Sequence, residues 1–207
     1  MENRIVFENN QVASKYFDSK TNTITIKDEN NTSFYFDFVN YIPESLNLVL
    51  INSKITLIEN YKNVSKSNYK ITIDKESSLN RLSILVDNND IDIKRDVDNY
   101  GYYKSMQIDL SSSNLRSDEN INMLEENAYA LIIDGIYAFK KANKKYQTNL
   151  NHFSKDTTSK AQIFAATASL NLAIIPLSNW PLAISIGNIP DASPTPRTFS
   201  PVSCQWI

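Results

Sequence analysis

Apolar and polar side chains alternate in several short segments along the first half of the chain. The alternation is sharpest over residues 33–40, where Phe34, Phe36 and Phe38 share one side of an extended backbone. A period of two residues is typical of β-strands. Similar segments are separated by turns rich in Asn, Asp and Ser, and they span residues 4–7, 22–27, 46–50, 55–57, 69–73, 82–86 and 102–110. Seven or eight short strands of this kind predict a mainly β fold, an antiparallel β-sandwich or barrel.

The apolar positions of each segment are readily identified from this alternation. They are Ile24 and Ile26; Leu46, Leu48 and Leu50; Ile55 and Leu57; Ile71 and Ile73; Leu82, Ile84 and Val86; and Met106, Ile108 and Leu110.

A different period follows over residues 118–145. Ser117 is a favourable N-cap, and Asp118 and Glu119 stand where negative charge complements the helix dipole. Apolar residues recur at steps of three and four, which places them on one face of a helix; they are Ile121, Leu124, Ala128, Leu131, Ile132, Ile136 and Phe139, widened by Met123, Ala130, Ile133 and Tyr137. Four lysines, Lys140, Lys141, Lys144 and Lys145, occupy the last turns. The pattern predicts one long amphipathic helix packed across the β-domain.

Two polar segments lack apolar periodicity. Residues 87–100 are highly charged, and residues 147–159 form a polar connection that contains His152. We expect the first of these to be an exposed loop.

The composition changes sharply after residue 160. From Lys160 to Ile207 the only charged residues are Lys160, Asp191 and Arg197. Residues 170–177 and 182–189 have the pattern of strands, and six of the seven prolines fall between Pro176 and Pro201. Proline disfavours regular sheet and favours extended backbone. We therefore predict one domain over residues 1–189 and an extended C-terminal arm over residues 190–207.

Composition narrows the range of partners. The chain has 207 residues, 42% of them hydrophobic, and 21 basic against 23 acidic residues. It has no basic field, so nucleic acid is not an expected partner. The N-terminus has neither the basic nor the apolar region of a secretory signal, which favours a cytoplasmic location. The frequent Asn, Lys, Ile and Tyr are typical of an AT-rich genome.

Glycine is scarce, with only Gly101, Gly135 and Gly187 in the chain. Glycine-rich phosphate loops and dinucleotide fingerprints are therefore excluded. Turns must instead use Asn, Asp and Ser, which tolerate left-handed backbone conformations.

No residues form a recognisable catalytic or metal-binding pattern. His152 and Cys204 are unique, and a nucleophilic pair would require them to converge in space. One histidine and one cysteine do not fill a structural zinc site. The tyrosines of residues 100–103 favour packing over stacking with a ligand. Two acidic sets remain without a matching motif: Asp87, Asp90, Asp92, Asp96 and Asp98 depart from the EF-hand spacing, and Glu125 and Glu126 are adjacent. We assign no catalytic residue, cofactor or metal and do not expect an enzyme.

The uncharged segment 161–189 admits three interpretations: a buried layer of the domain, a surface covered in an oligomer, or a segment that inserts into a bilayer. Its prolines and asparagines interrupt any apolar span of about twenty residues, so it does not predict a transmembrane helix. We favour a non-enzymatic structural protein that assembles with copies of itself, as a shell, tube, filament or crystalline inclusion of viral, phage or bacterial type. The predicted anchors are Trp180, Phe199, Val202, Trp206 and Ile207. The alternatives are a pore-forming toxin that uses residues 161–189 and a β-module that binds a sugar or another small ligand.

Overall fold

The protein is a parallel β-solenoid in a computed structural model that describes residues 3–86, 90–139, 142–168, 197–198 and 202–206. Every regular element in these residues is a strand. The strands are β1 (Asn3–Glu8), β2 (Gln11–Ala13), β3 (Phe17–Asp18), β4 (Thr23–Lys27), β5 (Asn30–Phe38), β6 (Leu46–Ile51), β7 (Lys54–Tyr61), β8 (Lys66–Ile73), β9 (Ser78–Leu85), β10 (Ile91–Asn99), β11 (Tyr102–Asp109), β12 (Leu115–Met123), β13 (Tyr129–Phe139), β14 (Lys144–His152), β15 (Thr158–Ala168), β16 (Arg197–Thr198) and β17 (Val202–Trp206).

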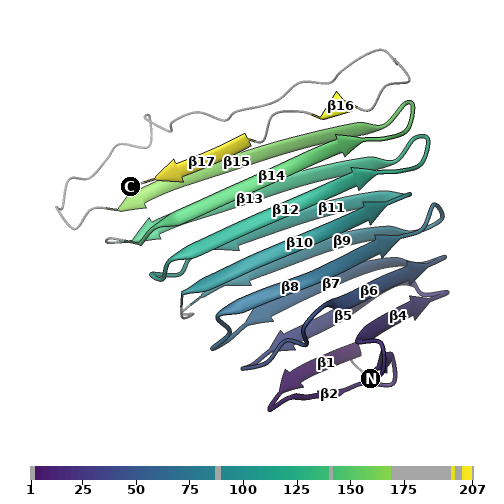
Figure 1. Cartoon of the computed structure of the whole chain (residues 1–207), viewed down its shortest axis with the longest axis horizontal. Coiled ribbons are helices and arrows are strands. Elements are labelled where there is room, and N and C mark those ends of the chain that lie inside the picture. The colour runs from purple at the N-terminus through teal and green to yellow at the C-terminus, as the bar shows by residue number, and fades with distance from the viewer. Residues whose placement is uncertain (1–2, 87–89, 140–141, 169–196, 199–201, 207) are drawn as a thin grey trace.

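Successive strands from β4 to β15 alternate between two sheets, so that each coil adds one strand to each (Figure 1). Sheet A has the order β15-β13-β11-β9-β7-β5-β1-β2, and sheet B the order β16-β14-β12-β10-β8-β6-β4-β3. Pairing between successive coils is parallel and in register. Leu79 of β9 pairs with Tyr103 of β11, 24 residues later, and Tyr103 pairs with Ala130 of β13, 27 residues later. The chain therefore winds as a stack in which each coil contacts the coils before and after it.

The described ends of this stack pair differently from its body. At the N-terminal end β2 pairs antiparallel with β1, and β3 pairs antiparallel with β4. At the C-terminal end β16 and β17 both pair antiparallel with β14. Short antiparallel strands occupy edges that would otherwise offer unpaired backbone groups to another chain.

The core lies between the inner faces of the two sheets. In the first coils it is aromatic and aliphatic: Phe34, Phe36 and Phe38 are fully buried. The Phe7 and Phe38 ring centroids are 4.5 Å apart, and the Phe38 ring stacks on Tyr61 at 5.0 Å. The segments predicted over residues 4–7, 22–27, 33–40, 46–50, 55–57, 69–73, 82–86 and 102–110 are strands over most of their length. The predicted antiparallel β-sandwich or barrel is wrong, because the strands of successive coils pair in parallel and wind as a solenoid. Apolar and polar residues alternate in the same way in parallel and antiparallel strands, so the alternation did not distinguish these folds.

The turns use the residues that the scarcity of glycine predicted. All ten described non-glycine residues with positive φ are Asn, Asp or Ser, and neither described glycine has a positive φ. Gly101 serves a different need, because a Cβ atom there would lie 2.4 Å from the Ser77 carbonyl oxygen and 2.5 Å from that of Asp74. Only glycine permits such a close backbone approach.

The predicted helix over residues 118–145 is wrong. The described residues of this range belong to β12, the turn after it, β13 and the start of β14. Two features explain the error. Apolar residues occupy both faces of β13, so that steps of two and steps of three or four are both satisfied. In addition Asn127, with φ 64°, turns the chain where the helix would have continued.

The predicted exposed loop over residues 87–100 is also wrong over its described part, which contains β10. Ile91, Ile93, Arg95, Val97 and Asn99 all point into the solenoid and are buried. Because two of these inward residues, Arg95 and Asn99, are polar, the strand lacks the regular alternation of apolar and polar residues that would have predicted it.

The C-terminal arm begins at residue 190 in the sequence prediction, a boundary that lies outside the described residues. The described part of the arm includes β17, which pairs with β14 of the same chain from Val202 with Thr148 to Trp206 with Lys144.

Candidate functional site

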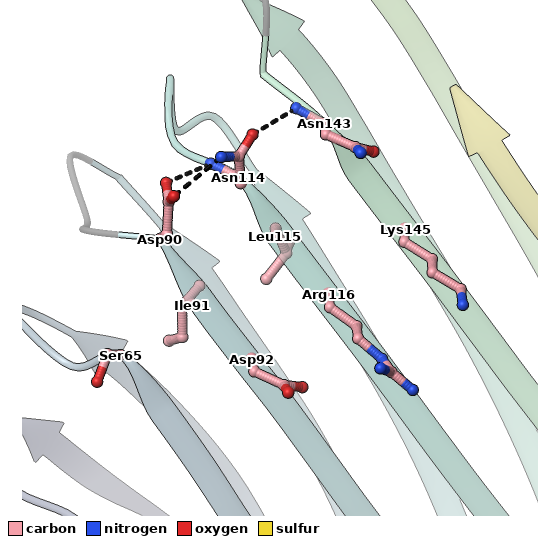
Figure 2. Close-up of a pocket in the computed structure, with 9 residues that line it drawn as sticks. All are labelled: Ser65, Asp90, Ile91, Asp92, Asn114, Leu115, Arg116, Asn143 and Lys145. Carbon is pink, nitrogen blue, oxygen red and sulfur yellow. Dashed lines mark hydrogen bonds between the residues drawn. The ribbon is translucent and has the colours of Figure 1, made fainter. Parts of the chain in front are cut away.

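A shallow groove crosses the outer face of sheet B at the beginning of β10, β12 and β14 (Figure 2). One of its walls is a ladder of turn residues from three successive coils. The Asn114 backbone and side-chain nitrogens donate to the two Asp90 carboxylate oxygens, each at 2.9 Å. The Asn143 backbone nitrogen donates to Asn114 Oδ1 at 2.8 Å. The bonds from Asn114 lower the pKa of Asp90, since they stabilise its charged form.

The other wall carries charged side chains that cross-strand register places side by side. Asp92, Arg116 and Lys145 occupy paired positions on β10, β12 and β14. Arg116 is held by Asp118, with Nε and Nη2 at 2.9 and 2.6 Å from Oδ2, and this bond raises the pKa of Arg116. The groove lining thus combines two carboxylates, Asp90 and Asp92, with two cations, Arg116 and Lys145, and its polar groups can bond to a hydroxylated ligand.

Further along the same face, amide and carboxylate side chains bond to one another between coils. Asn122 donates to Asp98 at 2.9 Å, and Asn151 donates to Asn122 at 3.1 Å. Burial opposes ionisation of Asp98, but the bonds from Asn122 and Lys70 outweigh it and lower its pKa. A second ladder joins Asp96, Asn120 and Asn149. These groups satisfy one another, so the ladders stabilise the coil stack and are not a free binding surface.

The outer face of sheet A has the opposite character. Cross-strand pairs place Ile58, Leu82, Met106 and Ile133 in one row across four strands. A second row contains Ile84, Ile108, Gly135 and Phe164. We call this surface the outer apolar face; it comprises Ile58, Leu82, Ile84, Val86, Met106, Ile108, Leu110, Leu131, Ile133, Gly135, Tyr137 and Phe164. Val86, Leu110 and Phe164 are 48%, 47% and 42% exposed.

Beneath this face the interior is polar. On β9 the inward side chains at positions 81 and 83 are Arg81 and Ser83; on β11 Ser105, Gln107 and Asp109 point inward. Leu82 and Ile84 on β9 and Met106 and Ile108 on β11 occupy the alternate positions and face outward. Leu79, Leu85 and Tyr103 on the same strands are buried.

A buried ion network centred on Glu59 joins the two sheets across the interior. Arg81 Nε donates to Glu59 Oε2 at 2.9 Å, and Arg81 Nη1 donates to Ser105 at 2.6 Å. Arg95 reaches across from sheet B, where its Nη2 lies 3.5 Å from Glu59 Oε2 and its Nη1 donates to Gln107 at 3.1 Å. All three charged groups are fully buried, so water does not screen them.

A second buried ion pair joins Lys144 to Asp109 at 2.8 Å. Lys144 also donates to the carbonyl and hydroxyl oxygens of Ser111 at 3.0 and 2.9 Å. The sequence prediction placed Lys144 in the last turns of a helix, whereas it lies on β14 and is fully buried.

The described interior holds one more acid than base. Its buried carboxyl groups are Glu59, Asp109, Glu119 and Asp134, and its buried cations are Arg81, Arg95 and Lys144. Burial, reinforced by the negative charge of Glu119, raises the pKa of Asp134 to about 7 against the opposing effect of Arg81 and Arg95. A protonated Asp134 would balance the remaining charges.

The residues considered for a nucleophilic pair, His152 and Cys204, lie far apart in the structure. Cys204 pairs with Tyr146, six positions along β14 from His152, a separation of roughly 20 Å at about 3.3 Å per residue. These two therefore form no nucleophilic pair. Both ring nitrogens of His152 instead lie near hydroxyls, those of Thr157 and Ser159, at 2.5 and 2.9 Å. In the described residues Asp90, Asp92, Asp96 and Asp98 lie along β10 and its preceding turn, and no group of residues there is arranged to hold a metal ion.

The tyrosines of residues 100–103 have different environments. Tyr102 stacks on Tyr129 with ring centroids 4.9 Å apart. Tyr103 is buried and donates to Glu119 at 2.5 Å, and burial raises its pKa. Glu125 and Glu126 are exposed in the turn before β13.

Two of the predicted anchors, Val202 and Trp206, lie at the ends of β17. Trp180, Phe199 and Ile207 lie outside the described residues. The sequence prediction missed the outer apolar face, although the apolar residues on both sides of β13 signalled that one set could not be buried inside the domain.

Comparisons with family models, with curated proteins and with solved structures find no match to this chain. Within the part of the chain that the structure describes, no helix is long and apolar enough to cross a membrane.

Proposed function

We propose that this chain is a non-enzymatic structural protein that assembles with copies of itself, and that the outer apolar face is where the copies meet. The observation that carries the proposal is the inverted pattern of β9 and β11. Leu82 and Ile84 of β9 and Met106 and Ile108 of β11 point away from the domain, while Arg81, Ser105 and Gln107 occupy the interior beside them. Contiguous apolar surfaces of this kind on a folded chain favour association.

Covering the outer apolar face with a partner is energetically favourable. Full burial of one large aliphatic side chain contributes about 1.5–3 kcal/mol. Val86 and Leu110 are nearly half exposed, and the remaining aliphatic residues of the face are partly exposed. A partner that covers them gains a fraction of this free energy at each residue, in proportion to the exposed area, without disturbing the buried ion network behind them.

The described part of the C-terminal arm pairs within its own chain, and its role in assembly is a separate part of the proposal. Strand β17 adds to sheet B through main-chain pairing with β14. Strand addition of this kind works equally with an edge on the same chain or on a neighbour. Docking of the anchors Trp180, Phe199, Val202, Trp206 and Ile207 on a neighbouring copy stays a prediction.

Light scattering on a sizing column tests this function. We expect the wild-type chain to form a defined oligomer whose mass falls on dilution, and Met106→Lys on the outer apolar face to give a folded monomer. The matched control is Gln147→Lys on the outer face of sheet B, which should leave the oligomer intact. A truncation ending at Ile189 separates the contribution of the arm.

A wild-type chain that is monomeric at all accessible concentrations would overturn the proposal. Leakage of dye from liposomes by such a monomer would favour the membrane-inserting alternative. Saturable binding of a sugar by the monomer, abolished by Arg116→Ala, would instead favour a binding module that uses the groove on sheet B.

A further inference from the structure

Gly135 lies in the middle of β13, an 11-residue strand, and no contact among the described residues requires a glycine there. Its φ is not positive. A Cβ atom at Gly135 would meet only the Gln107 carbonyl oxygen at 3.9 Å, which is ordinary contact. Gly101 differs, because a Cβ atom there would lie 2.4 Å from backbone. Glycine within a strand weakens it and commonly marks the close approach of another group.

The surroundings of Gly135 indicate what approaches. Its outward side belongs to the outer apolar face, between Ile108 on β11 and Phe164 on β15. Ile133 and Tyr137 flank it along β13 and are partly exposed. The missing side chain therefore leaves a notch whose neighbours on all four sides are apolar.

We infer that Gly135 is a socket that receives a large apolar side chain from the outer apolar face of a second copy of this chain. This inference rests on the proposed function and specifies its contact. An apolar occupant fits because no charged residue borders the notch. A second copy fits because the same face supplies both the notch and protruding aliphatic side chains of suitable size.

A two-fold axis along β11 specifies which side chain of the second copy lies opposite Gly135. Two copies of sheet A can stack face to face about a two-fold axis that runs along β11, and such an interface is self-complementary. The axis brings β9 of one copy opposite β13 of the other. Because Ile84, Ile108 and Gly135 lie in one cross-strand row, Ile84 of the second copy then stands opposite Gly135, and Leu82 stands opposite Ile133. The large side chain of Ile84 thus lies opposite Gly135, which has no side chain.

The size of the face is adequate for a pair of copies. Five strands about 4.8 Å apart and three rows about 6.6 Å apart cover roughly 500 Å² in projection, and protruding side chains enlarge the accessible surface. Standard interfaces bury about 800 Å² per partner. A second copy that covers the whole face therefore buries roughly 1,000 Å² in total, which is at the lower limit for a specific interface.

The test uses the full chain and measures association and folding separately. Gly135→Val should leave the unfolding midpoint of the dissociated chain unchanged or higher, since valine favours strands and its Cβ atom would make only ordinary contact. The same substitution should raise the dissociation constant of the oligomer at least tenfold in sedimentation equilibrium. Thr56→Val, outward on β7 outside the outer apolar face, is the matched control and should leave that constant unchanged.

A size exchange identifies the partner side chain. Ile84→Ala alone should weaken association, whereas the double variant Ile84→Ala with Gly135→Val should recover most of the wild-type affinity. A wild-type chain that never associates overturns the proposed function together with the socket. An oligomer that Gly135→Val leaves unchanged overturns the socket alone. Loss of affinity without recovery in the double variant overturns Ile84 as the occupant.

Discussion

In the first coils of the solenoid, the interior between β5 and β6 consists of phenylalanine and leucine, among them Phe36 and Leu48. Later coils present Glu59, Arg81 and Arg95 at equivalent inward positions. The backbone is the same parallel ladder in both regions. The comparison shows that this fold is specified by backbone pairing and alternation, while the chemistry of the inward side chains can change along the stack.

The two regions also differ in their outer surfaces. Where the interior becomes ionic, the outer face of sheet A becomes apolar, with Leu82 and Met106 pointing outward. On these two strands Leu82 and Met106 therefore lie on the outer surface of the sheet and not in the interior. Apolar side chains on the surface are unfavourable in water unless another surface covers them. This is the physical basis of the proposed assembly.

The largest expected effect comes from removing one member of the buried ion network. Arg81→Met leaves Glu59 buried with Arg95 at 3.5 Å as its remaining cation. Removing one partner of a buried ion pair costs about 3–5 kcal/mol. Because Arg95 still compensates part of the Glu59 charge, we expect a loss of unfolding free energy near the lower end of that range in chemical denaturation. The matched substitution in the apolar region, Leu48→Met, should cost less than about 1.5 kcal/mol. Equal losses at the two sites would remove the distinction between the regions.

Asp134→Asn should change how stability depends on pH. The pKa of Asp134 is about 7 in the folded chain, against 3.8 for the ordinary carboxyl. Between these values the folded chain binds more protons than the unfolded chain, so wild-type stability should fall as pH rises from about 4 to about 7 and then level off.

At about 1.4 kcal/mol per pKa unit, Asp134 contributes a decrease of up to about 4 kcal/mol across that window. Asp134→Asn should lack this decrease and should exceed the wild type in stability above pH 7. Denaturation at a series of pH values measures it, with the exposed Asp92→Asn as control. Parallel pH profiles for wild type and Asp134→Asn would show that the buried carboxyl does not titrate.

The smallest expected effect is on the polar outer face of sheet B. Asn122→Ala removes the bond to Asp98 and the bond from Asn151, and we expect a loss of about 1 kcal/mol. It should also raise the pKa of Asp98, measurable by NMR titration, because a bond that stabilises its charged form is lost. Asn68→Ala, exposed on β8, is the control and should change stability by less than about 0.5 kcal/mol. A loss as large as that of Arg81→Met would mean that the ladders, rather than the buried network, hold the coils together.

Periodicity succeeded where inward residues are apolar and failed where they are polar. The period of two identified β5 and β6 because Phe36 and Leu48 stand on the buried side. The same period misidentified β10, since Arg95 and Asn99 point inward. In β13 both faces are apolar, so a helical interpretation fitted equally well. No local rule signals that a polar residue will find its partner 20 to 40 positions away.

What the sequence determined by itself was the extended conformation of the first strands and the chemistry of the turns, where Asn, Asp and Ser adopt left-handed conformations in place of glycine. Both are local properties, set by steric limits on one or a few residues. The tertiary structure alone decided that the strands pair in parallel and which side of β9 and β11 is buried. Apolar and polar residues alternate in the same way in parallel and antiparallel sheets, so alternation does not determine the pairing. A charged side chain such as Arg81 is stable in the interior only because the preceding coil places Glu59 beside it.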